Sequence, residues 1–358
     1  MKGKIAGIVL LSLSVTVTTA CGREPVEEKS ASGEEDVEIT LPEDSELTVD
    51  YTSVEGVYAE KGFYLAIVAK NLDSGYSDAV KKGASCAIED INEKLGYEGD
   101  EKVYMTFEGP PDSIDIDSQI NTVDAVLAEN PGALCLAAID VQSCQAQLET
   151  AKDNGIPVVI LDSGVDSDLV ACSCVTDNRA AAAEAAERLC EAIGDSGQVI
   201  IMSHAQSAET SEDRIAGFRK ELQDNHPDVD LVNISYENEE QSIEDMLLEA
   251  LEEYPDTAGI FCTNENVTES VLETVGRLED KEIKIVGFDA GEVQIQAIRD
   301  GREYGTVCQN PYGMGYAAVV AALRAASGQT VDNWIDPGYQ WVDRSNIDVE
   351  ENKKYLYL

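Results

Sequence analysis

The residues Ile283-Lys284-Ile285-Val286-Gly287-Phe288-Asp289-Ala290 form the pattern of one buried strand that leads into a helix. The run of apolar and β-branched residues is short enough for a single strand. It ends at Asp289, shortly before a helical pattern from Glu292 to Asp300. A strand that passes so quickly into a helix predicts that the Asp289 carboxylate lies at the rim of a sheet.

Four other apolar runs end in the same way, each at polar residues. They are Phe63 to Ala69 (before Lys70-Asn71), Ile156 to Leu161 (before Asp162-Ser163), Val199 to Met202 (before Ser203-His204) and Gly259 to Cys262 (before Thr263-Asn264). A parallel sheet collects such strand ends at one edge, where open α/β folds bind their ligands. The sequence therefore predicts a binding protein.

Strand-like and helical patterns alternate from Phe63 onward, with short loops between them. The remaining strand-like runs are Val103 to Phe107, Ala133 to Ile139, Val170 to Val175, Asp230 to Tyr236 and Tyr304 to Cys308. Helical patterns include residues 78–95, 118–129, 178–193, 209–223, 239–254, 267–278 and 312–327. Because the strands are continuously apolar, we expect an α/β fold whose parallel sheets carry helices on both faces. The unit restarts near Gln198, so two sheets are expected rather than one.

Composition limits the class of protein. The chain has 358 residues, of which 43% are hydrophobic, and this is enough for two lobes with cores of their own. It carries 70 acidic and 25 basic side chains, a formal net charge of -45. Such a charge repels phosphate backbones and anionic lipid surfaces, so nucleic acid is not an expected partner. The simpler interpretation of the acidic surface is that it keeps the protein soluble.

Residues 1–20 have the pattern of a signal peptide. Lys2 and Lys4 precede an apolar segment from Ile5 to Val17 that is short for a membrane span, and small residues follow it. Cys21 comes next and is similar to the cysteine of a bacterial lipobox, which is acylated and becomes the new N-terminus. Thr18 departs from the leucine usual in that motif. The chain is therefore predicted to be exported and anchored to the membrane through lipid on Cys21, the alternative being a plain signal peptide and an incidental cysteine.

Residues 21–60 are acidic and poor in apolar side chains, so we expect a lipidated flexible tether there. The eight other cysteines lie mostly inside apolar runs and lack the paired CxxC spacing of a zinc or redox site. They are expected to be buried free thiols, which in an exported protein would suit an anaerobic habitat.

Seven short motifs occur together in an order that points to one family. They are Ile156-Pro157-Val158-Val159-Ile160-Leu161-Asp162, Thr176-Asp177-Asn178, Arg214-Ile215-Ala216-Gly217-Phe218, Tyr254-Pro255-Asp256, Asn264, Val286-Gly287-Phe288-Asp289 and Gln309. The chain from about Phe63 to Ile347 resembles a periplasmic sugar-binding protein of the ribose-binding type, a solute-binding protein of ABC transporters. The effector domains of LacI-type repressors share this fold.

The resemblance implies a set of ligand residues in a cleft between two Rossmann-like lobes. Arg214, Asn264, Asp289 and Gln309 would bind sugar hydroxyls from the far lobe and hinge, and Asp162 from the near lobe. Their chemistry suits this role independently, because planar Asp, Asn, Gln and Arg groups can bracket neighbouring hydroxyls.

Other positions depart from the family pattern. Ser163 stands where the family often has Arg, and Ser74-Gly75-Tyr76 replaces its Asn, Pro and aromatic residues, although Tyr76 could still stack on a sugar. Tyr236 could substitute for an aromatic residue that is missing near Asn238. The predicted ligand-binding set therefore also includes Ser74, Tyr76, Ser163 and Tyr236.

Each predicted contact has a simpler structural alternative. Asp289 and Asn264 could cap the helices that follow them, and Arg214 could pair with acidic residues on a helix surface. His204 ends a strand, but the chain has only two histidines and no ligand spacing, so no metal site is expected. No catalytic motif and no cofactor-binding motif is recognised, and we do not expect an enzyme or a cofactor.

The predicted lobes exchange segments through about three crossovers, near Asp177, Gln309 and Tyr339. The N-terminal lobe is expected to comprise residues 61–177 plus 310–338, and the C-terminal lobe residues 178–309 plus 339–358. Ligand binding would close the cleft by a hinge motion.

The sequence leaves two functions open. In the first, a monomeric extracytoplasmic lipoprotein captures a monosaccharide or similar polyol and delivers it to an ABC permease. In the second, the same lipoprotein presents its bound sugar to a membrane receptor or sensor kinase. A transcription regulator conflicts with the export signal, the acidic charge and the absence of a basic helix-turn-helix before Phe63.

Overall fold

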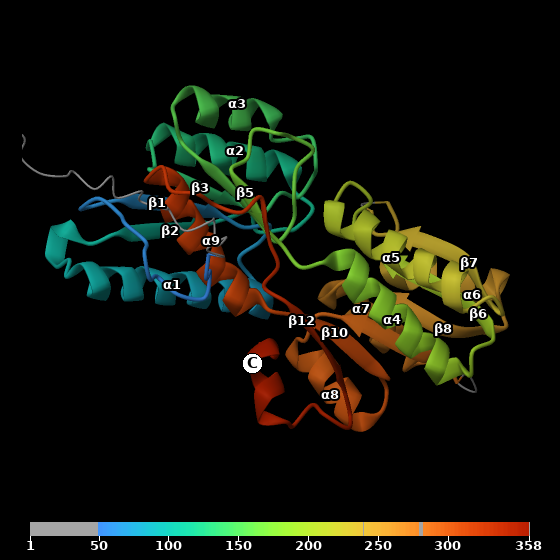
Figure 1. Cartoon of the computed structure of the whole chain (residues 1–358). Coiled ribbons are helices and arrows are strands. Elements are labelled where there is room, and N and C mark those ends of the chain that lie inside the picture. Colours follow the sequence, from blue (N-terminus) through green and yellow to red (C-terminus); the bar gives the residue numbers. More distant parts are fainter. Residues whose placement is uncertain (1–48, 239, 279–281, 358) are drawn as a thin grey trace, which may run out of the picture. The chain divides into compact units, whose positions relative to one another are not determined.

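The computed structural model describes residues 49–238, 240–278 and 282–357 (Figure 1). These residues form an α/β fold with two six-stranded sheets, each covered by helices. This confirms the predicted fold class. The predicted signal peptide and Cys21 lie outside the described residues.

The first sheet is parallel throughout and has the strand order β11-β5-β4-β3-β1-β2. Its central strands are buried on both faces, as their continuous apolar runs predict. The strands are β1 (Tyr64–Val68), β2 (Tyr104–Glu108), β3 (Ala133–Leu136), β4 (Val158–Leu161), β5 (Cys172–Cys174) and β11 (Trp334–Ile335). Its helices are α1 (Gly75–Leu95), η1 (Gly99–Glu101), α2 (Ile116–Ala128), α3 (Gln145–Asp153) and α9 (Pro311–Ala326).

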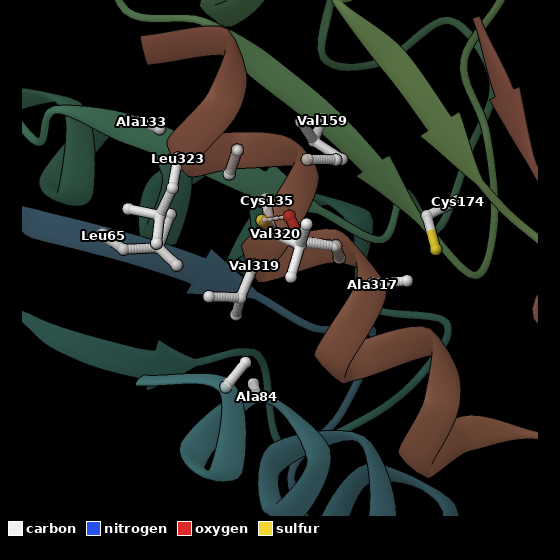
Figure 2. Packing of buried hydrophobic residues seen from close by; sticks show 14 of the residues in the cluster. Leu65, Ala84, Ala133, Cys135, Val159, Cys174, Ala317, Val319, Val320 and Leu323 are labelled. Carbon is white, nitrogen blue, oxygen red and sulfur yellow. Dashed lines mark hydrogen bonds between the residues drawn. The ribbon is translucent and has the colours of Figure 1, made fainter. Parts of the chain in front are cut away.

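Two helix pairs cover the two faces of the first sheet. Helices α1 and α9 pack on one face, where Figure 2 shows Val319, Val320 and Leu323 of α9 among Leu65 and Cys135 of the strands. Helices α2 and α3 pack on the other face. The first sheet with these helices is called the N-terminal lobe below.

The second sheet has the order β12-β10-β9-β8-β6-β7, with β12 antiparallel to β10 and the other neighbours parallel. The strands are β6 (Gly197–Ser203), β7 (Val229–Tyr236), β8 (Thr257–Cys262), β9 (Lys284–Phe288), β10 (Gly305–Gln309) and β12 (Tyr339–Asp343). The helices are α4 (Asn178–Ile193), α5 (Glu209–Asn225), α6 (Ile243–Glu253), α7 (Glu265–Val275) and α8 (Glu292–Asp300). Helices α4 and α5 pack on one face and α6 and α7 on the other, and this unit is the C-terminal lobe.

The chain passes between the sheets after β5, after β10 and after β11. Strands β5 and β10 each end just before a crossing. Helices α4 and α9 begin shortly after these strands, with Asp177 and Asn310 as their N-caps. This connectivity places residues from distant parts of the sequence at the facing edges of the two sheets.

The predicted tether is wrong at its C-terminal end. Tyr51, Val54, Val57 and Ala59 are buried in the core that α1 and α9 share with the first sheet. The Tyr51 hydroxyl also accepts a hydrogen bond of 2.7 Å from the backbone N–H of Asp332. Four apolar side chains spread among acidic residues were too few to be recognised from composition, but they are enough to hold this segment on the lobe.

The eight cysteines of the described residues are free thiols, and all except Cys86 are buried. Burial raises the pKa of the Cys144 thiol to about 11, so this group stays uncharged at neutral pH. Within the described ranges, no helix is long and apolar enough to span a membrane. The same residues contain no group of three or more side chains that could hold a metal ion.

Candidate functional site

Two carboxylates stand at equivalent places in the two sheets. Asp162 follows β4 of the first sheet and Asp289 follows β9 of the second, and they are only 5% and 6% exposed. Both have a left-handed backbone, with φ values of 66° and 77°. Such a conformation costs free energy for a residue other than glycine, and it turns each side chain away from the line of its strand.

The two carboxylates line one cavity of about 100 Å3 between the lobes. Seven of the predicted ligand residues line it: Ser74, Tyr76, Asp162, Arg214, Asn264, Asp289 and Gln309. The space is large enough for several water molecules, and its wall combines apolar side chains with these polar groups. The structure therefore brings most of the predicted set together.

Asp162 is held by two donors of the N-terminal lobe. The Lys70 Nζ lies 2.9 Å from its Oδ2, and the Tyr76 hydroxyl donates to its Oδ1 at 2.7 Å. Burial alone would raise the pKa of this carboxyl, but Lys70 and the hydrogen bond from Tyr76 hold the pKa below its ordinary value. Asp162 is therefore a charged acceptor at neutral pH.

Asp289 is held from within the C-terminal lobe and by the segment that connects the lobes. Its Oδ1 accepts a hydrogen bond of 2.7 Å from Gln309 Nε2, and its Oδ2 accepts one of 3.2 Å from the backbone N–H of Glu265. Gln309 is fixed in turn, because its Oε1 accepts from the Thr176 hydroxyl at 2.9 Å. Burial raises the pKa of Asp289 against the opposing effect of Arg214. Each oxygen keeps a free lone pair for a ligand donor.

Arg214 lies inside the lobe and not on a helix surface, so the alternative of a surface ion pair is wrong. The side chain is 3% exposed. Its Nε donates to Asn178 Oδ1 at 2.8 Å, its Nη1 donates to the backbone carbonyl of Thr263, and the guanidinium lies 3.6 Å from the centre of the Phe288 ring. Three contacts fix the guanidinium plane, and Arg214 also lines the cavity.

Helix capping, the simpler alternative to ligand binding, is found for Asn264 but not for Asp289 at α8. Asn264 does cap α7, since its Oδ1 accepts from the backbone N–H of Val267 at 3.0 Å, yet the residue also lines the cavity. Ser74 likewise caps α1 and lines the cavity. Asp289 does not cap α8, whose N-cap is Gly291 without a side-chain bond.

Two predicted ligand residues, Ser163 and Tyr236, are not among the residues that line the cavity, and their ligand role stays a prediction. Ser163 is fully buried, and its Oγ has no hydrogen-bond partner among the described residues. It follows the left-handed Asp162, so the turn directs it away from the cavity. Tyr236 lies at the end of β7 and bonds weakly to Glu212, while its neighbour Glu237 lines the cavity. Successive residues of a strand face opposite sides of the sheet, so Tyr236, one position before Glu237, faces away from the cavity.

The cavity residues outside the predicted ligand set include Lys70, Phe107, Glu237 and Glu265. Lys70 supplies beside Asp162 the cation that the family pattern places at the following residue. Its position at the end of a strand was the available signal. Phe107 provides an aromatic wall from β2, and nothing in the sequence marks it among the other apolar residues of that strand.

Glu265 is a cavity carboxyl with a strongly raised pKa. Burial and the neighbouring charges of Asp289 and Glu269 raise its pKa to about 8, so it is largely protonated at neutral pH. His204 is neutral as well, because burial and the nearby charges of Arg214 and Lys70 lower its pKa well below the ordinary value. Its two ring nitrogens lie 2.8 Å and 2.9 Å from the hydroxyls of Thr263 and Thr210. The histidine thus serves the frame of the site.

The relatives of the chain include import and transport binding proteins. The chain is 23% identical over 334 residues to the ribose import binding protein of Bacillus subtilis, covering 93% of this chain and 96% of that protein. It is 25% identical to the D-apiose import binding protein of Actinobacillus succinogenes, covering 74% and 82%.

Solved structures with the same fold include two bound to sugars. A carbohydrate transporter solute-binding protein of Agrobacterium radiobacter in complex with D-arabinose has a TM-score of 0.74 and 25% identity, covering 83% of this chain and 99% of that one. An ABC transporter solute-binding protein of Agrobacterium vitis with bound D-fucose has a TM-score of 0.74 and 27% identity, covering 82% and 100%.

The family match covers most of the chain. The periplasmic binding protein domain matches residues 65–330, which include both carboxylates and every predicted ligand residue. The two lobes, the strand-end carboxylates between them and this match lead to one conclusion: the chain belongs to the periplasmic binding protein family.

Proposed function

We propose that this protein is an extracytoplasmic solute-binding lipoprotein that captures a monosaccharide or similar polyol between its lobes and delivers it to an ABC importer. The observation that carries the proposal is the convergence of Asp162, Arg214, Asp289 and Gln309 on one cavity. Hydroxyl groups both donate and accept hydrogen bonds, so a wall that mixes carboxylate, amide and guanidinium groups matches a polyol.

The charge balance of the cavity supports a neutral ligand. Lys70 and Arg214 oppose the charges of Asp162 and Asp289. Burial raises the pKa of Glu237 and, to about 8, that of Glu265, which favours the uncharged form of both groups. A ligand with a net charge would disturb this balance in a site of low dielectric constant. A neutral sugar would not.

The apolar part of the wall supports a sugar in particular. Phe107, Ile114 and Ile139 line the same cavity as the polar groups. A sugar ring has C–H faces that pack on such surfaces while its hydroxyls reach the polar residues at the edge. The names of the relatives, which include binding proteins for ribose and D-apiose, agree with this class of ligand.

A thermal-shift screen of the full chain, purified in detergent, tests the proposal. The panel comprises D-ribose, D-apiose, D-arabinose, D-tagatose, D-fucose and xylitol, with L-leucine and L-glutamate as amino-acid comparisons. A ligand at 100 times its dissociation constant stabilises a protein by about 2.7 kcal/mol, so at least one sugar should raise the melting temperature clearly. Stabilisation by an amino acid and by none of the sugars would contradict the proposal.

A further inference from the structure

The last part of the chain packs beside the cavity. After β12 the chain forms the short 3-10 helix η2 (Glu350–Tyr355) and continues to Tyr357 (Figure 1). Residues 350–357 are called the strap here. Tyr357 is 8% exposed and belongs to an apolar cluster with Ile298 of α8, Val342 of β12 and Ile347.

Tyr357 contacts the C-terminal lobe at the residue after Asp289. Its hydroxyl oxygen accepts a hydrogen bond of 2.7 Å from the backbone N–H of Ala290. Ala290 is fully buried, so without this bond its N–H would have no hydrogen-bond partner, and water could not easily take the place of the hydroxyl. The bond therefore fixes the turn that carries the Asp289 carboxylate in its left-handed conformation.

The ring of Tyr357 contacts the N-terminal lobe. It meets the ring of Tyr76 edge to face, with centroids 5.7 Å apart and planes at 85°. A Cβ atom on Gly75 would lie 3.3 Å from the Tyr357 ring and 3.2 Å from its carbonyl oxygen, so the strap lies directly on the first turn of α1. Tyr76 in turn donates its hydroxyl hydrogen bond to Asp162.

One side chain thus supports a ligand-site residue of each lobe. We propose that Tyr357 is a positioning residue of the cavity, which holds the Asp289 turn through the Ala290 amide and holds Tyr76 against Asp162 through its ring. The effect on ligand affinity rests on the proposed sugar-binding function, whereas the effect on the Ala290 amide does not.

Tyr357→Phe and Tyr357→Ala separate the two contacts. The phenylalanine variant keeps the ring against Tyr76 and loses the hydrogen bond to Ala290, and the alanine variant loses both. Ile347→Ala is the matched control, because Ile347 is 2% exposed in the same apolar cluster but does not line the cavity. Ile347→Ala should lower the melting temperature of the full chain and leave the contacts of Tyr357 with Ala290 and Tyr76 in place.

Amide hydrogen exchange without sugar gives the first readout. In Tyr357→Phe the Ala290 amide should exchange about tenfold faster, the effect of one lost hydrogen bond, and in Ile347→Ala it should not change relative to the rest of the lobe. Equal Ala290 exchange in wild type and Tyr357→Phe would overturn the positioning role. The exchange result tests the role of Tyr357 even if no sugar of the panel binds. Absence of sugar binding would count against the proposed function and not against the role of Tyr357.

Calorimetric titration with the sugar of the panel that binds the wild-type chain most tightly gives the second readout. Tyr357→Phe should weaken binding about three- to tenfold and Tyr357→Ala about thirtyfold or more, with Ile347→Ala within about twofold of wild type. If the alanine variant does not fold, the phenylalanine variant still decides. Wild-type affinity in Tyr357→Phe, or an equal loss in Ile347→Ala, would show that Tyr357 only stabilises the fold.

Discussion

At the scale of single residues, the site depends on the backbone conformation of Asp162 and Asp289. Among the described residues, only Asn130, Asp162, Asp195 and Asp289 combine a side chain with a left-handed backbone. Two of these four residues are the cavity carboxylates, at the ends of β4 and β9. Such strained conformations persist only where the surrounding structure fixes them. Here Lys70 fixes the Asp162 carboxylate, and Gln309 and the backbone N–H of Glu265 fix that of Asp289.

Asp289→Asn should weaken sugar binding by about 1.5 to 3 kcal/mol, because it exchanges a charge-assisted acceptor for a neutral amide. Asparagine tolerates the left-handed backbone, so the fold should survive the change. Asp195→Asn is the control, since Asp195 has the same backbone conformation, with φ of 55°, and does not line the cavity. Calorimetric titration of both variants checks the prediction, and equal affinities would remove Asp289 from the ligand set.

Glu265→Gln should change how stability depends on pH. The pKa of Glu265 is raised from 4.5 to about 8 in the folded protein, so the folded state holds a proton that the unfolded state releases above pH 4.5. Its contribution to stability is present below pH 4.5 and is lost as the pH rises through 8. Urea titrations should show a smaller loss of stability between pH 5 and pH 8 in the variant than in wild type.

Glu273→Gln provides the comparison for that experiment, because Glu273 lies exposed on the same helix, α7. This variant should lose stability with pH in parallel with the wild-type chain. A Glu265→Gln curve that is also parallel to wild type would show that Glu265 is ionised in the folded protein.

Seven of the nine predicted ligand residues line the cavity, and strand ends or family motifs mark most of them in the sequence. Ser163 and Tyr236 do not line it, because the side to which a residue points depends on local backbone turns. Residue order does not reveal the left-handed turn at Asp162, nor that Glu237 and not Tyr236 faces inward at the end of β7.

At the scale of elements, α1 and α9 approach each other unusually closely. A Cβ atom on Gly83 would lie 1.9 Å from the carbonyl oxygen of Tyr312, and one on Gly315 would lie 2.1 Å from that of Val80. The two glycines therefore allow the helix backbones to meet. This contact supports the helix that begins with Gly75 and Tyr76 beside the cavity.

Gly315→Ala should destabilise the protein by about 1 to 3 kcal/mol, because the added methyl group must push α9 away from α1. The gain in helix propensity, about 1 kcal/mol, offsets only part of this cost. Lys82→Ala on the exposed face of α1 is the control and should change stability by less than about 0.5 kcal/mol. Denaturant unfolding of both variants measures the difference. An unchanged midpoint for Gly315→Ala would mean that the helices separate without cost.

Cys21→Ser tests the predicted lipid anchor, which lies outside the described residues. If the Cys21 thiol carries the lipid, the variant should move from the membrane fraction to the soluble extracytoplasmic fraction, because loss of the acyl chains removes the anchoring apolar surface. Fractionation of cells that express wild type or Cys21→Ser checks this. Cys86→Ser, at a half-buried cysteine of α1, should remain with the membrane. Membrane retention of Cys21→Ser would reject the anchor.

The ten predicted strands all form, because long apolar runs between turn residues are strong signals. The short β11 and the antiparallel β12 were not predicted. Trp334–Ile335 has only two residues, and Tyr339–Asp343 mixes polar and apolar side chains next to a chain crossing. Pairing with β5 and β10 makes these segments strands, and such pairing is a property of the folded chain.

At the scale of the whole molecule, the three crossings of the chain bring the two halves of the site together. Asp162 and Tyr76 come from one lobe, Arg214 and Asp289 from the other, and Gln309 from the end of β10, where the chain crosses. A ligand that contacts both lobes binds most tightly when the lobes close on it. The doubled α/β unit was predictable from the repeated strand and helix pattern, whereas the strap was not, because its contacts span most of the chain.

A crystal structure of the full chain with the most stabilising sugar of the panel tests the central claim most directly. The account predicts one sugar in the cavity, with hydroxyls within 3.2 Å of Asp289 and Arg214 on one side and of Asp162 on the other, about the limit of a normal hydrogen bond. It also predicts a sugar ring that packs against Phe107. A sugar bound elsewhere, or held in the cavity by residues of a single lobe, would contradict it.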